Sequence, residues 1–353
     1  MNMPKQIQEG KAVLAIYPGE IKKSDVVFYN PEMRENRDIS VLAVKAFSSQ
    51  TKRKLRVLDV MSATGVRGIR YALEAKSAVN EVIFNDINPY AYELIKKNIA
   101  LNRLETSYKI HKKEAGCLLH EYRFLGDVVD LDPFGTPAPY LDAAARSVSN
   151  KGLIMVTFTD TSVLSGTYPK VALRRYGVNI TKGFRPHQEL ALRVAYASLA
   201  KSLARFDKGM VPLVGYVYKH YVRIVAAIDK HKDAATRIYD YIGTKEIKLS
   251  DKIYFAKDVW VGKLGDADFV KKMLSFCSSS ISPEACVLLN ILKDEYEYNF
   301  YYDIPFIAKH YRLRLKNVEN LLNHFPGIRA HFKKDYVIAT NASLEDVISA
   351  LKY

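Results

Sequence analysis

The sequence is poor in cysteine, and its few cysteines are far apart. Among 353 residues only Cys117, Cys277 and Cys286 are cysteines, and no two of them form a Cys-x-x-Cys pair. An odd number of scattered thiols predicts neither a disulfide framework nor a four-cysteine zinc site. We therefore expect a protein of a reducing compartment that holds no metal.

Long apolar runs are also missing. No stretch approaches the ~18 uninterrupted apolar residues that indicate a membrane-spanning helix. The first residues, MNMPKQIQEGK, lack the apolar block of a secretory signal. We expect a soluble cytoplasmic protein and not one that spans a membrane. The length favours two domains because single cores rarely grow beyond ~250–300 residues, and we expect a monomer.

Acidic residues are fewer than basic ones. The chain has 53 Lys and Arg against 38 Asp and Glu, a net charge of +15. Residues 1–229 hold 34 basic and 22 acidic residues (+12), whereas residues 230–353 hold 19 and 16 (+3). Excess positive charge favours polyanionic partners such as nucleic acid or an acidic membrane surface. A solvated cationic face that binds nothing is the alternative.

Short apolar segments alternate with helical ones in the first part of the chain. Residues 55–60 (LRVLDV) precede the glycine turn MSATGVRG and then a helical stretch, and Asn88 and Pro89 are suited to begin a further helix. The segments that we predict as strands are residues 55–60, 82–84, 108–111, 127–131 and 152–158. This alternation predicts an α/β fold with a Rossmann-like, doubly wound parallel sheet.

We expect a catalytic domain over residues 1–229 and a smaller accessory domain over residues 230–353. A helix over residues 186–205 and a hairpin of residues 211–218 and 221–228 would complete the first domain. The second domain has helical spacing and hairpin signals over residues 266–276, 283–298, 305–311, 316–324, 327–340 and 344–351. That order predicts an α+β domain with a winged-helix-like element, a shape that serves nucleic-acid binding or packing alone.

An acidic residue follows each of the first four predicted strands: Asp59, Asp86, Glu114 and Asp132. Ligands of doubly wound sheets bind at the carboxyl ends of the strands, so one rim would carry four carboxylates. Such a rim suits a ligand that is cationic or rich in hydroxyl and amino donors, and suits a phosphate poorly. S-adenosylmethionine meets that description. Helix capping by the same acids is the alternative.

The same geometry assigns parts of this cofactor to parts of the rim. The loop 59–68 would approach the methionine moiety, Asp86 would accept both ribose hydroxyls, and Glu114 would accept from the adenine amino group. The candidate cofactor-binding residues from this reasoning are Asp59, Ser62, Gly65, Asp86, Glu114 and Ala115.

The turn Asp132-Pro133-Phe134-Gly135 has the chemistry to activate an exocyclic amine. The Asp132 carboxylate and the Pro133 carbonyl would accept both N–H groups and stabilise positive charge that develops as the methyl group arrives. Asp132 would also take the released proton. Phe134 would stack on a base that has left its helix. A β-turn with a side-chain acceptor is the structural alternative.

These residues resemble the tRNA (guanine-N2-)-dimethyltransferases, a family that acts on guanine 26 of tRNA. The matching segments are VFYNPEMRENRD at 27–38, SATGVRG at 62–68, NDINP at 85–89, DLDPFGTP at 130–137, RRYG at 174–177 and WVGKL at 260–264. The resemblance covers roughly residues 10–330. Many relatives have a cysteine-rich, zinc-like segment before the tryptophan motif, whereas residues 240–260 here contain no cysteine.

The resemblance implies S-adenosylmethionine as the cofactor and tRNA as the substrate. It implies that the cofactor-binding residues are Arg37, Arg67, Asp86, Glu114 and Ala115. It also implies that Asp132 is the principal catalytic residue and that Phe28 and Phe134 line the guanine pocket. Two successive methylations would give N2-methylguanosine and then N2,N2-dimethylguanosine.

A tRNA substrate accounts for the basic first domain, since phosphates around the target base must be held. The candidate phosphate contacts are Lys52, Arg53, Lys54, Arg174, Arg175, Lys182, Arg185, Arg312, Arg314, Lys316, Lys333 and Lys334. We expect His187 to be a hydrogen-bonded structural residue and not a base.

Three other functions stay open. The first is the same chemistry on another RNA base, such as a guanine of ribosomal RNA or an adenine. The second is a nucleic-acid-binding module that has lost catalysis. The third is a DNA-binding regulator that uses a C-terminal helix-turn-helix, against which stands the balance of only +3 in that part of the chain.

Overall fold

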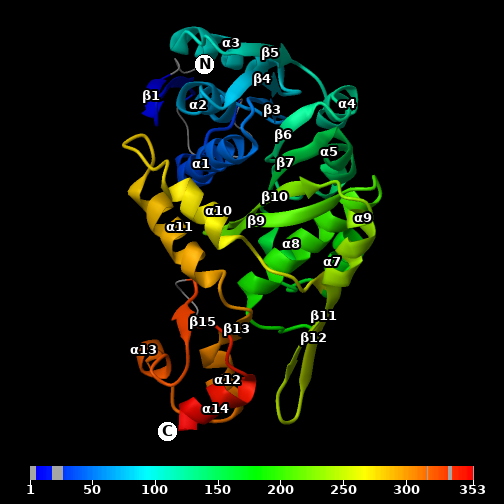
Figure 1. Ribbon diagram of the computed structural model, residues 1–353, viewed down its shortest axis with the longest axis vertical. Coiled ribbons are helices and arrows are strands. Elements are labelled where there is room, and N and C mark those ends of the chain that lie inside the picture. Colours follow the sequence, from blue (N-terminus) through cyan, green and yellow to red (C-terminus); the bar gives the residue numbers. More distant parts are fainter. Residues whose placement is uncertain (1–4, 18–26, 316, 333–335, 353) are drawn as a thin grey trace.

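A seven-stranded mixed sheet organises the computed structural model, which describes residues 5–17, 27–315, 317–332 and 336–352 (Figure 1). In spatial order its strands are β5 (Ser107–His111), β4 (Val79–Asn85), β3 (Leu55–Asp59), β6 (Gly126–Leu131), β7 (Val148–Phe158), β10 (Tyr221–Asp229) and β9 (Gly209–Tyr218). The first five are parallel, and β10 and β9 add an antiparallel hairpin. The predicted doubly wound sheet and its closing hairpin are confirmed.

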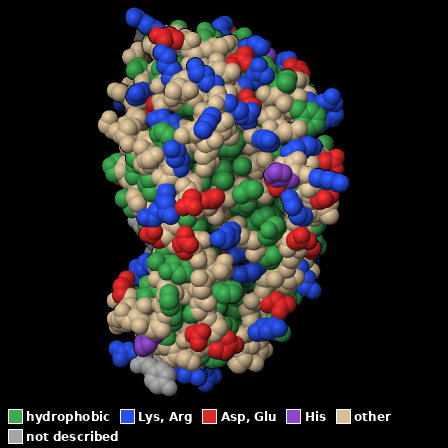
Figure 2. All heavy atoms as spheres, in the orientation of Figure 1, with side chains coloured by type: hydrophobic (Ala, Val, Ile, Leu, Met, Phe, Trp, Pro, Cys, Tyr) green, Lys and Arg blue, Asp and Glu red, His purple; other side chains and the backbone are tan. Residues whose placement is uncertain are grey.

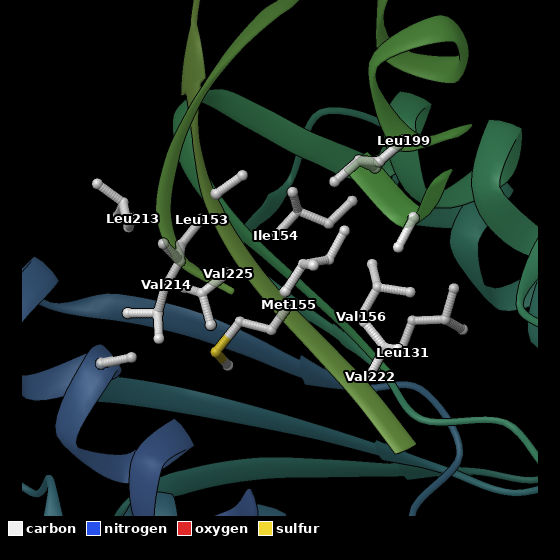
Figure 3. Close-up of a cluster of buried hydrophobic side chains, with 14 of the residues drawn as sticks. Leu131, Leu153, Ile154, Met155, Val156, Leu199, Leu213, Val214, Val222 and Val225 are labelled. Carbon is white, nitrogen blue, oxygen red and sulfur yellow. The ribbon is translucent and has the colours of Figure 1, made fainter. Parts of the chain in front are cut away.

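Helices cover both faces of this sheet because its central strands are apolar on both sides. One set consists of α1 (Arg34–Thr51), α2 (Val66–Glu74) and α3 (Pro89–Asn102). The other consists of α4 (Ala115–Glu121), α5 (Leu141–Ser147) and α8 (His187–Ala204). Figure 3 shows part of the core, where side chains of β7 such as Ile154 and Val156 lie among those of β10, β6 and α8. Truncation of such a residue to Ala would cost about 2–5 kcal/mol.

Local capping chemistry begins the helices where the sequence predicted. The Asn88 side chain accepts a hydrogen bond from the Tyr90 amide at 2.9 Å, and Pro89 is the first residue of α3. Helix α2 begins after Gly65, whose φ of 78° favours glycine. The loop between β3 and α2 is thereby bent toward the carboxyl end of the sheet.

Several shorter elements complete the catalytic half of the chain. An N-terminal hairpin packs on α2 and α3. The hairpin consists of β1 (Lys5–Glu9) and β2 (Ala12–Ile16). The other short elements are η1 (Pro31–Met33), η2 (Ala138–Tyr140), α6 (Thr161–Leu164), α7 (Pro169–Tyr176) and β8 (Asn179–Ile180).

The residues that follow β10 return to the first domain before the chain leaves it. Strand β12 (Ile253–Trp260) pairs with β11 (Ile242–Lys248) and with β8, and the helices α10 (Ala267–Leu274) and α11 (Pro283–Glu295) pack on α1. Two short helical segments precede β11, namely α9 (Ala234–Arg237) and η3 (Ile238–Tyr241).

A separate small cluster of buried side chains marks the C-terminal module, residues 300–352 (Figure 1). Its elements are β13 (Phe300–Asp303), α12 (Ile304–His310), α13 (Val318–Leu321), β14 (Gly327–Arg329), β15 (Val337–Thr340) and α14 (Leu344–Lys352). The sheet order is β13-β15-β14. The hairpin and last helix agree with the sequence prediction, while the helix expected over residues 316–324 is reduced to the four residues of α13.

The prediction of no disulfide is wrong. Cys277, in the connection after α10, and Cys286, in the first turn of α11, form a disulfide with Cα atoms 6.8 Å apart. Their pairing depends on how these two helices pack, which spacing in the sequence does not show. Cys117 is free and exposed. Among the described residues no helix is long and apolar enough to cross a membrane.

Candidate functional site

Two adjoining cavities open at the carboxyl ends of β3, β4 and β6, the rim that the sequence predicted. The DPFG cavity has a volume of about 500 Å³ and is lined by the turn 132–135 with Arg37 and Arg67. The Asp86 cavity, about 570 Å³, is lined by Asp86, Glu114 and Ala115. The residues that line both are Phe28, Ala63, Pro133 and Phe134. Segments distant in the sequence thus meet at one site.

The carboxylates of the Asp86 cavity also fix the backbone around them. Asp86 accepts hydrogen bonds from the Ala63 amide (2.8 Å) and the Asn88 amide (2.9 Å), one on each oxygen. Each oxygen keeps a second lone pair, so the carboxylate can still accept two hydroxyl groups. Glu114 caps α4 by accepting from the Cys117 amide at 3.0 Å. Glu114 therefore both caps α4 and lines the Asp86 cavity.

Asp59 lies beneath the loop and is not among the described residues that line either cavity. Its buried carboxylate accepts a hydrogen bond from the Gly68 amide at 3.0 Å. Burial, together with the nearby charge of Asp130, raises the pKa of Asp59 to about 7. A Cβ at position 68 would lie 2.3 Å from the Phe84 ring, so only glycine fits there. Asp59 holds the loop that carries the site.

The other two loop residues predicted for the cofactor differ in position. Ser62 lines the DPFG cavity, and its hydroxyl donates to the Asp59 carbonyl at 2.8 Å. Gly65 is the N-cap residue of α2 and does not line the DPFG cavity. Its neighbours Thr64 and Val66 do.

Asp132 is held in a buried network of two carboxylates and two guanidinium groups. Arg67 donates through Nη2 to Asp132 Oδ2, and its Nη1 lies 3.5 Å from Asp130 Oδ2. Arg223 donates to Asp130 Oδ1 at 2.8 Å. The side chains of Asp130 and Arg223 are fully buried, whereas 24% of the Asp132 side chain is exposed. Removing one of these four side chains would leave an uncompensated buried charge and lower the free energy of unfolding by about 3–5 kcal/mol.

The network sets the charge of Asp132. Burial acts to raise the pKa of Asp132, but the guanidinium groups of Arg67 and Arg223 and a hydrogen bond from Thr157 outweigh it and lower the pKa below its usual value. The carboxylate is therefore ionised at neutral pH and can act only as an acceptor.

Thr159 fixes the turn that carries the predicted catalytic residues. Its hydroxyl accepts a hydrogen bond from the Gly135 amide at 2.7 Å, and its backbone N–H donates to the Gly135 carbonyl at 2.9 Å. Phe134 is 62% exposed, and its ring meets that of Phe28 edge-on with centroids 4.5 Å apart. The two aromatic rings predicted for the base pocket are thus in contact at the mouth shared by both cavities.

Arg37 lines the DPFG cavity but is anchored by a residue that sequence reasoning missed. Glu9 of β1 accepts hydrogen bonds from Nε (2.6 Å) and Nη2 of Arg37 and from Arg70 (3.0 Å). Burial opposes ionisation of Glu9, but Arg37 and Arg70 lower its pKa to about 2. Among the described residues Nη1 of Arg37 has no partner. Arg67, also predicted for the cofactor, instead directs its donors to Asp132 and to the side chains of α1.

Arg175 does not line either cavity of the site but is linked to it by an ion pair. It donates to Asp160 at 2.6 Å, and Asp160 also accepts from the Tyr176 hydroxyl at 2.8 Å. Asp160 lines the DPFG cavity, whereas Arg174 and Arg175 line a third cavity. Nothing in the sequence pattern pointed to Asp160, because its partners come from a helix nine or more residues later.

The remaining basic candidates are spread over the molecule, and Figure 2 shows Lys and Arg side chains interspersed with acidic ones over the visible face. Residues 52–54 precede β3 and so lie at the amino end of the sheet, opposite the cavities. Arg185 lies 3.5 Å from Asp303 of the C-terminal module. Lys182, Arg312 and Arg314 are exposed. Lys316, Lys333 and Lys334 lie outside the described residues.

Two histidines differ from each other in their surroundings. The ring of His187 is 3.1 Å from the Ser165 carbonyl, in agreement with a structural role. His220, in the turn between β9 and β10, was not predicted, yet it is exposed and lines the DPFG cavity. Its ring contacts Tyr221 edge-on and has no hydrogen-bond partner among the described residues. Its place opposite the turn 132–135 depends on the hairpin, so no local signal could reveal it.

No group of three or more His, Cys, Asp or Glu side chains within the described part of the chain is arranged to hold a metal ion. The polar groups of the two cavities are instead single carboxylates, guanidinium groups and hydroxyls. They suit an organic ligand with hydroxyl, amino and carboxylate groups.

Comparisons with known proteins agree with this geometry. The family model described as "N2,N2-dimethylguanosine tRNA methyltransferase" matches residues 4–352. The tRNA (guanine(26)-N(2))-dimethyltransferase of Pyrobaculum calidifontis is 37% identical over 315 residues, which cover 85% of this chain and 84% of that protein.

Two further relatives cover nearly the whole chain. The tRNA (guanine(26)-N(2)/guanine(27)-N(2))-dimethyltransferase of Aquifex aeolicus is 31% identical over 377 residues, 98% of this chain and 95% of that protein. The solved structure of Trm1 from Pyrococcus horikoshii in complex with S-adenosyl-L-methionine has a TM-score of 0.87 and 30% identity, and covers 99% of this chain and 100% of that chain.

Proposed function

We propose that this chain, which belongs to the N2,N2-dimethylguanosine tRNA methyltransferase family, transfers methyl groups from S-adenosylmethionine to the N2 amino group of guanine 26 in tRNA. The products are N2-methylguanosine and then N2,N2-dimethylguanosine. The observation that carries the residue assignments is the ionised Asp132 beside the Pro133 carbonyl, at the point where the DPFG and Asp86 cavities meet.

The lining of the two cavities fits S-adenosylmethionine. Asp86 would accept from the ribose hydroxyls with its remaining lone pairs, and Glu114 and Ala115 would border the adenine. Nη1 of Arg37, which has no partner among the described residues, would meet the cofactor carboxylate. The loop that includes Ser62 would lie along the methionine moiety. When bound, the cofactor supplies an electrophilic methyl group on a sulfonium.

Asp132 and Pro133 would make the guanine amine nucleophilic. The Asp132 carboxylate and the Pro133 carbonyl each accept one N–H of the amino group, which draws its lone pair out of the ring. As the N–CH3 bond forms and the S–CH3 bond breaks, Asp132 stabilises the positive charge on nitrogen and accepts the released proton. Phe134, exposed at the cavity mouth, offers a ring on which the extruded base stacks.

His220 would recognise the O6 oxygen on the same edge of guanine as the amino group. It lines the same cavity as Asp132 and its ring nitrogens have no partner among the described residues. An N–H of the imidazole can donate to the guanine O6, an acceptor that adenine lacks. Asp132 would thus recognise the amino group and His220 the oxygen.

The proposal also assigns separate roles to the two parts of the chain. Residues 1–229 would carry catalysis, and residues 230–353, with the C-terminal module, would contribute tRNA contacts. We propose a cytoplasmic monomer whose reaction uses no metal, since a sulfonium is already a good leaving group.

Methyl transfer onto tRNA tests the function directly. Unmodified transcripts with guanine or adenine at position 26 are incubated with the protein and labelled S-adenosylmethionine, and the nucleosides are separated. We expect label in N2-methylguanosine and N2,N2-dimethylguanosine with guanine 26 only. Label in another nucleoside, or equal label in the adenine transcript, would contradict the assignment.

A further inference from the structure

A third cavity, of about 340 Å³, lies beside the site and has a cationic lining. We call it the α7–α8 pocket. Its charged residues are Arg174, Arg175, Lys201, Arg205 and Asp142. Four cations and one carboxylate line the pocket, a formal charge of +3, and the ion pair of Arg175 with Asp160 outside the lining reduces this to +2. An excess of this size in a concave site favours an anionic ligand.

Two of the four cations of the α7–α8 pocket, Lys201 and Arg174, form no ion pair with a carboxylate among the described residues. Lys201 donates to the backbone carbonyls of Gly177 and Asp258, each at 3.0 Å, and so binds dipoles and not a carboxylate. Burial, together with the nearby charge of Arg205, lowers the pKa of Lys201 below its usual value, against the opposing effect of Asp258. Arg174 is exposed and has no carboxylate partner among the described residues.

The one internal acid contributes little. Arg205 and Asp142 are 2.7 Å apart, but 60% and 53% of their side chains are exposed, so water screens the pair. In addition, the hydroxyl oxygen of Ser198, a residue of the lining, is buried without a hydrogen-bond partner among the described residues. Guanidinium forks, an ammonium and a hydroxyl together are the donor set that suits a phosphate group.

The α7–α8 pocket adjoins both cavities of the site. Pro139 lines this pocket and the Asp86 cavity. Arg175, in the lining of the pocket, donates at 2.6 Å to Asp160, in the lining of the DPFG cavity. One ion pair therefore separates the cationic pocket from the place where the target base would sit.

We propose that the α7–α8 pocket binds a backbone phosphate of the tRNA next to the extruded nucleotide, held by Arg174, Lys201 and Arg205. This assignment rests on the proposed function, because it takes the RNA backbone to run past the DPFG cavity. A phosphate clamped there would hold the sugar of the flipped base while the base itself enters the cavity. Arg175 would have a double role, since it pairs with Asp160 on the cavity side.

The test compares an Arg174→Gln/Arg205→Gln variant with the wild-type chain. Both side chains are exposed or lie in a screened pair, so the fold should tolerate the change. tRNA affinity is measured without methyl donor over a range of salt concentrations. We expect binding at low salt to weaken at least about tenfold, and the slope of log affinity against log salt to fall by about 1 per lost phosphate contact. Lys97→Gln, on the exposed side of α3, is the matched control and should keep the wild-type slope.

A chemical substitution locates the contact. tRNAs are ligated with one neutral methylphosphonate linkage at each phosphate flanking nucleotide 26. We expect one such linkage to weaken binding by the wild type and by Lys97→Gln, and to have a clearly smaller effect on the double variant, which keeps only Lys201 of the three proposed contacts. An unchanged salt slope in the double variant, or equal sensitivity of both chains to every linkage, would overturn the proposal.

Inorganic phosphate distinguishes a site for the free ion. If phosphate stabilised the wild type against heat and not the double variant, while both bound tRNA equally, the pocket would be a free-phosphate site and the RNA assignment would be wrong. Methyl transfer is measured in separate reactions. A chain that binds tRNA with the expected salt slope but methylates no guanine would contradict the proposed function and leave the phosphate assignment standing.

Discussion

Arg67 donates a hydrogen bond through Nη2 to Oδ2 of Asp132, and so ties the start of α2 to the turn after β6. The contact keeps the carboxylate ionised and holds one of its oxygens in place. With hydrogen bonds from Arg67 and Thr157, the carboxylate still has lone pairs that can accept from a substrate amine beside the Pro133 carbonyl. Because Arg67 is itself bonded to the side chains of α1, the direction of Asp132 is set by two elements.

Asp132→Asn should reduce the rate of methyl transfer about 10²–10³-fold, because the amide presents donors where the reaction needs a charged acceptor. Single-turnover transfer to guanine-26 tRNA measures this rate, and calorimetry measures cofactor affinity. The affinity should change far less, since Asp86 and Glu114 bind elsewhere. A variant with the wild-type rate would show that Asp132 is not the acceptor.

Phe134→Ala should lower kcat/KM for tRNA about 5–160-fold, since a stacking contact with a base contributes ~1–3 kcal/mol. Thermal unfolding should change little because most of the ring is exposed. Phe134→Tyr keeps the stacking face and should retain most of the activity. Equal losses in the Ala and Tyr variants would mean that stacking is not its role.

His220→Gln or His220→Ala should lower kcat/KM on guanine-26 tRNA by about 3–10-fold, the value of one hydrogen bond. On tRNA with 2-aminopurine at position 26, which keeps the amino group and lacks the oxygen, the Ala variant and the wild type should react equally. Lys219→Ala, the adjacent turn residue outside the lining of the DPFG cavity, is the control. A loss on both substrates would exclude recognition of O6.

Glu9 should make stability depend on pH. Its pKa is lowered from 4.5 to about 2 in the folded state, so its contribution is complete above about pH 4.5 and is lost as the pH falls toward 2. From that shift, Glu9→Gln should cost about 3 kcal/mol of unfolding free energy at pH 7, and much less at pH 2.5. Denaturant unfolding at both pH values gives the two differences.

Glu93→Gln is the matched control for that measurement. Glu93 pairs with Lys96 on the surface at 3.1 Å with 67% of its side chain exposed, so its replacement should cost well under 1 kcal/mol. A cost for Glu9→Gln that stays the same at pH 7 and pH 2.5 would contradict the role assigned to the Glu9 charge.

Features that depend on local chemistry were determined by the sequence alone. Alternating strands and helices, the Asn88 cap, the acids at the strand ends and the turn 132–135 all follow from short segments, and parallel strands bring their carboxyl ends to one rim. For this reason the cavities lie at the carboxyl ends of the strands, as the sequence predicted, and Asp86, Glu114 and Asp132 line them.

Tertiary structure alone decided which side chains pair within that rim. Glu9 meets Arg37 from 28 residues away, and Arg223 reaches Ser40 across 183 residues. Buried charges require partners, but the partner is whichever group the packing of helices and strands brings within reach. The same reason explains the positions of His220 and Arg175 and the disulfide between Cys277 and Cys286. Each depends on contacts between elements and none on a local pattern.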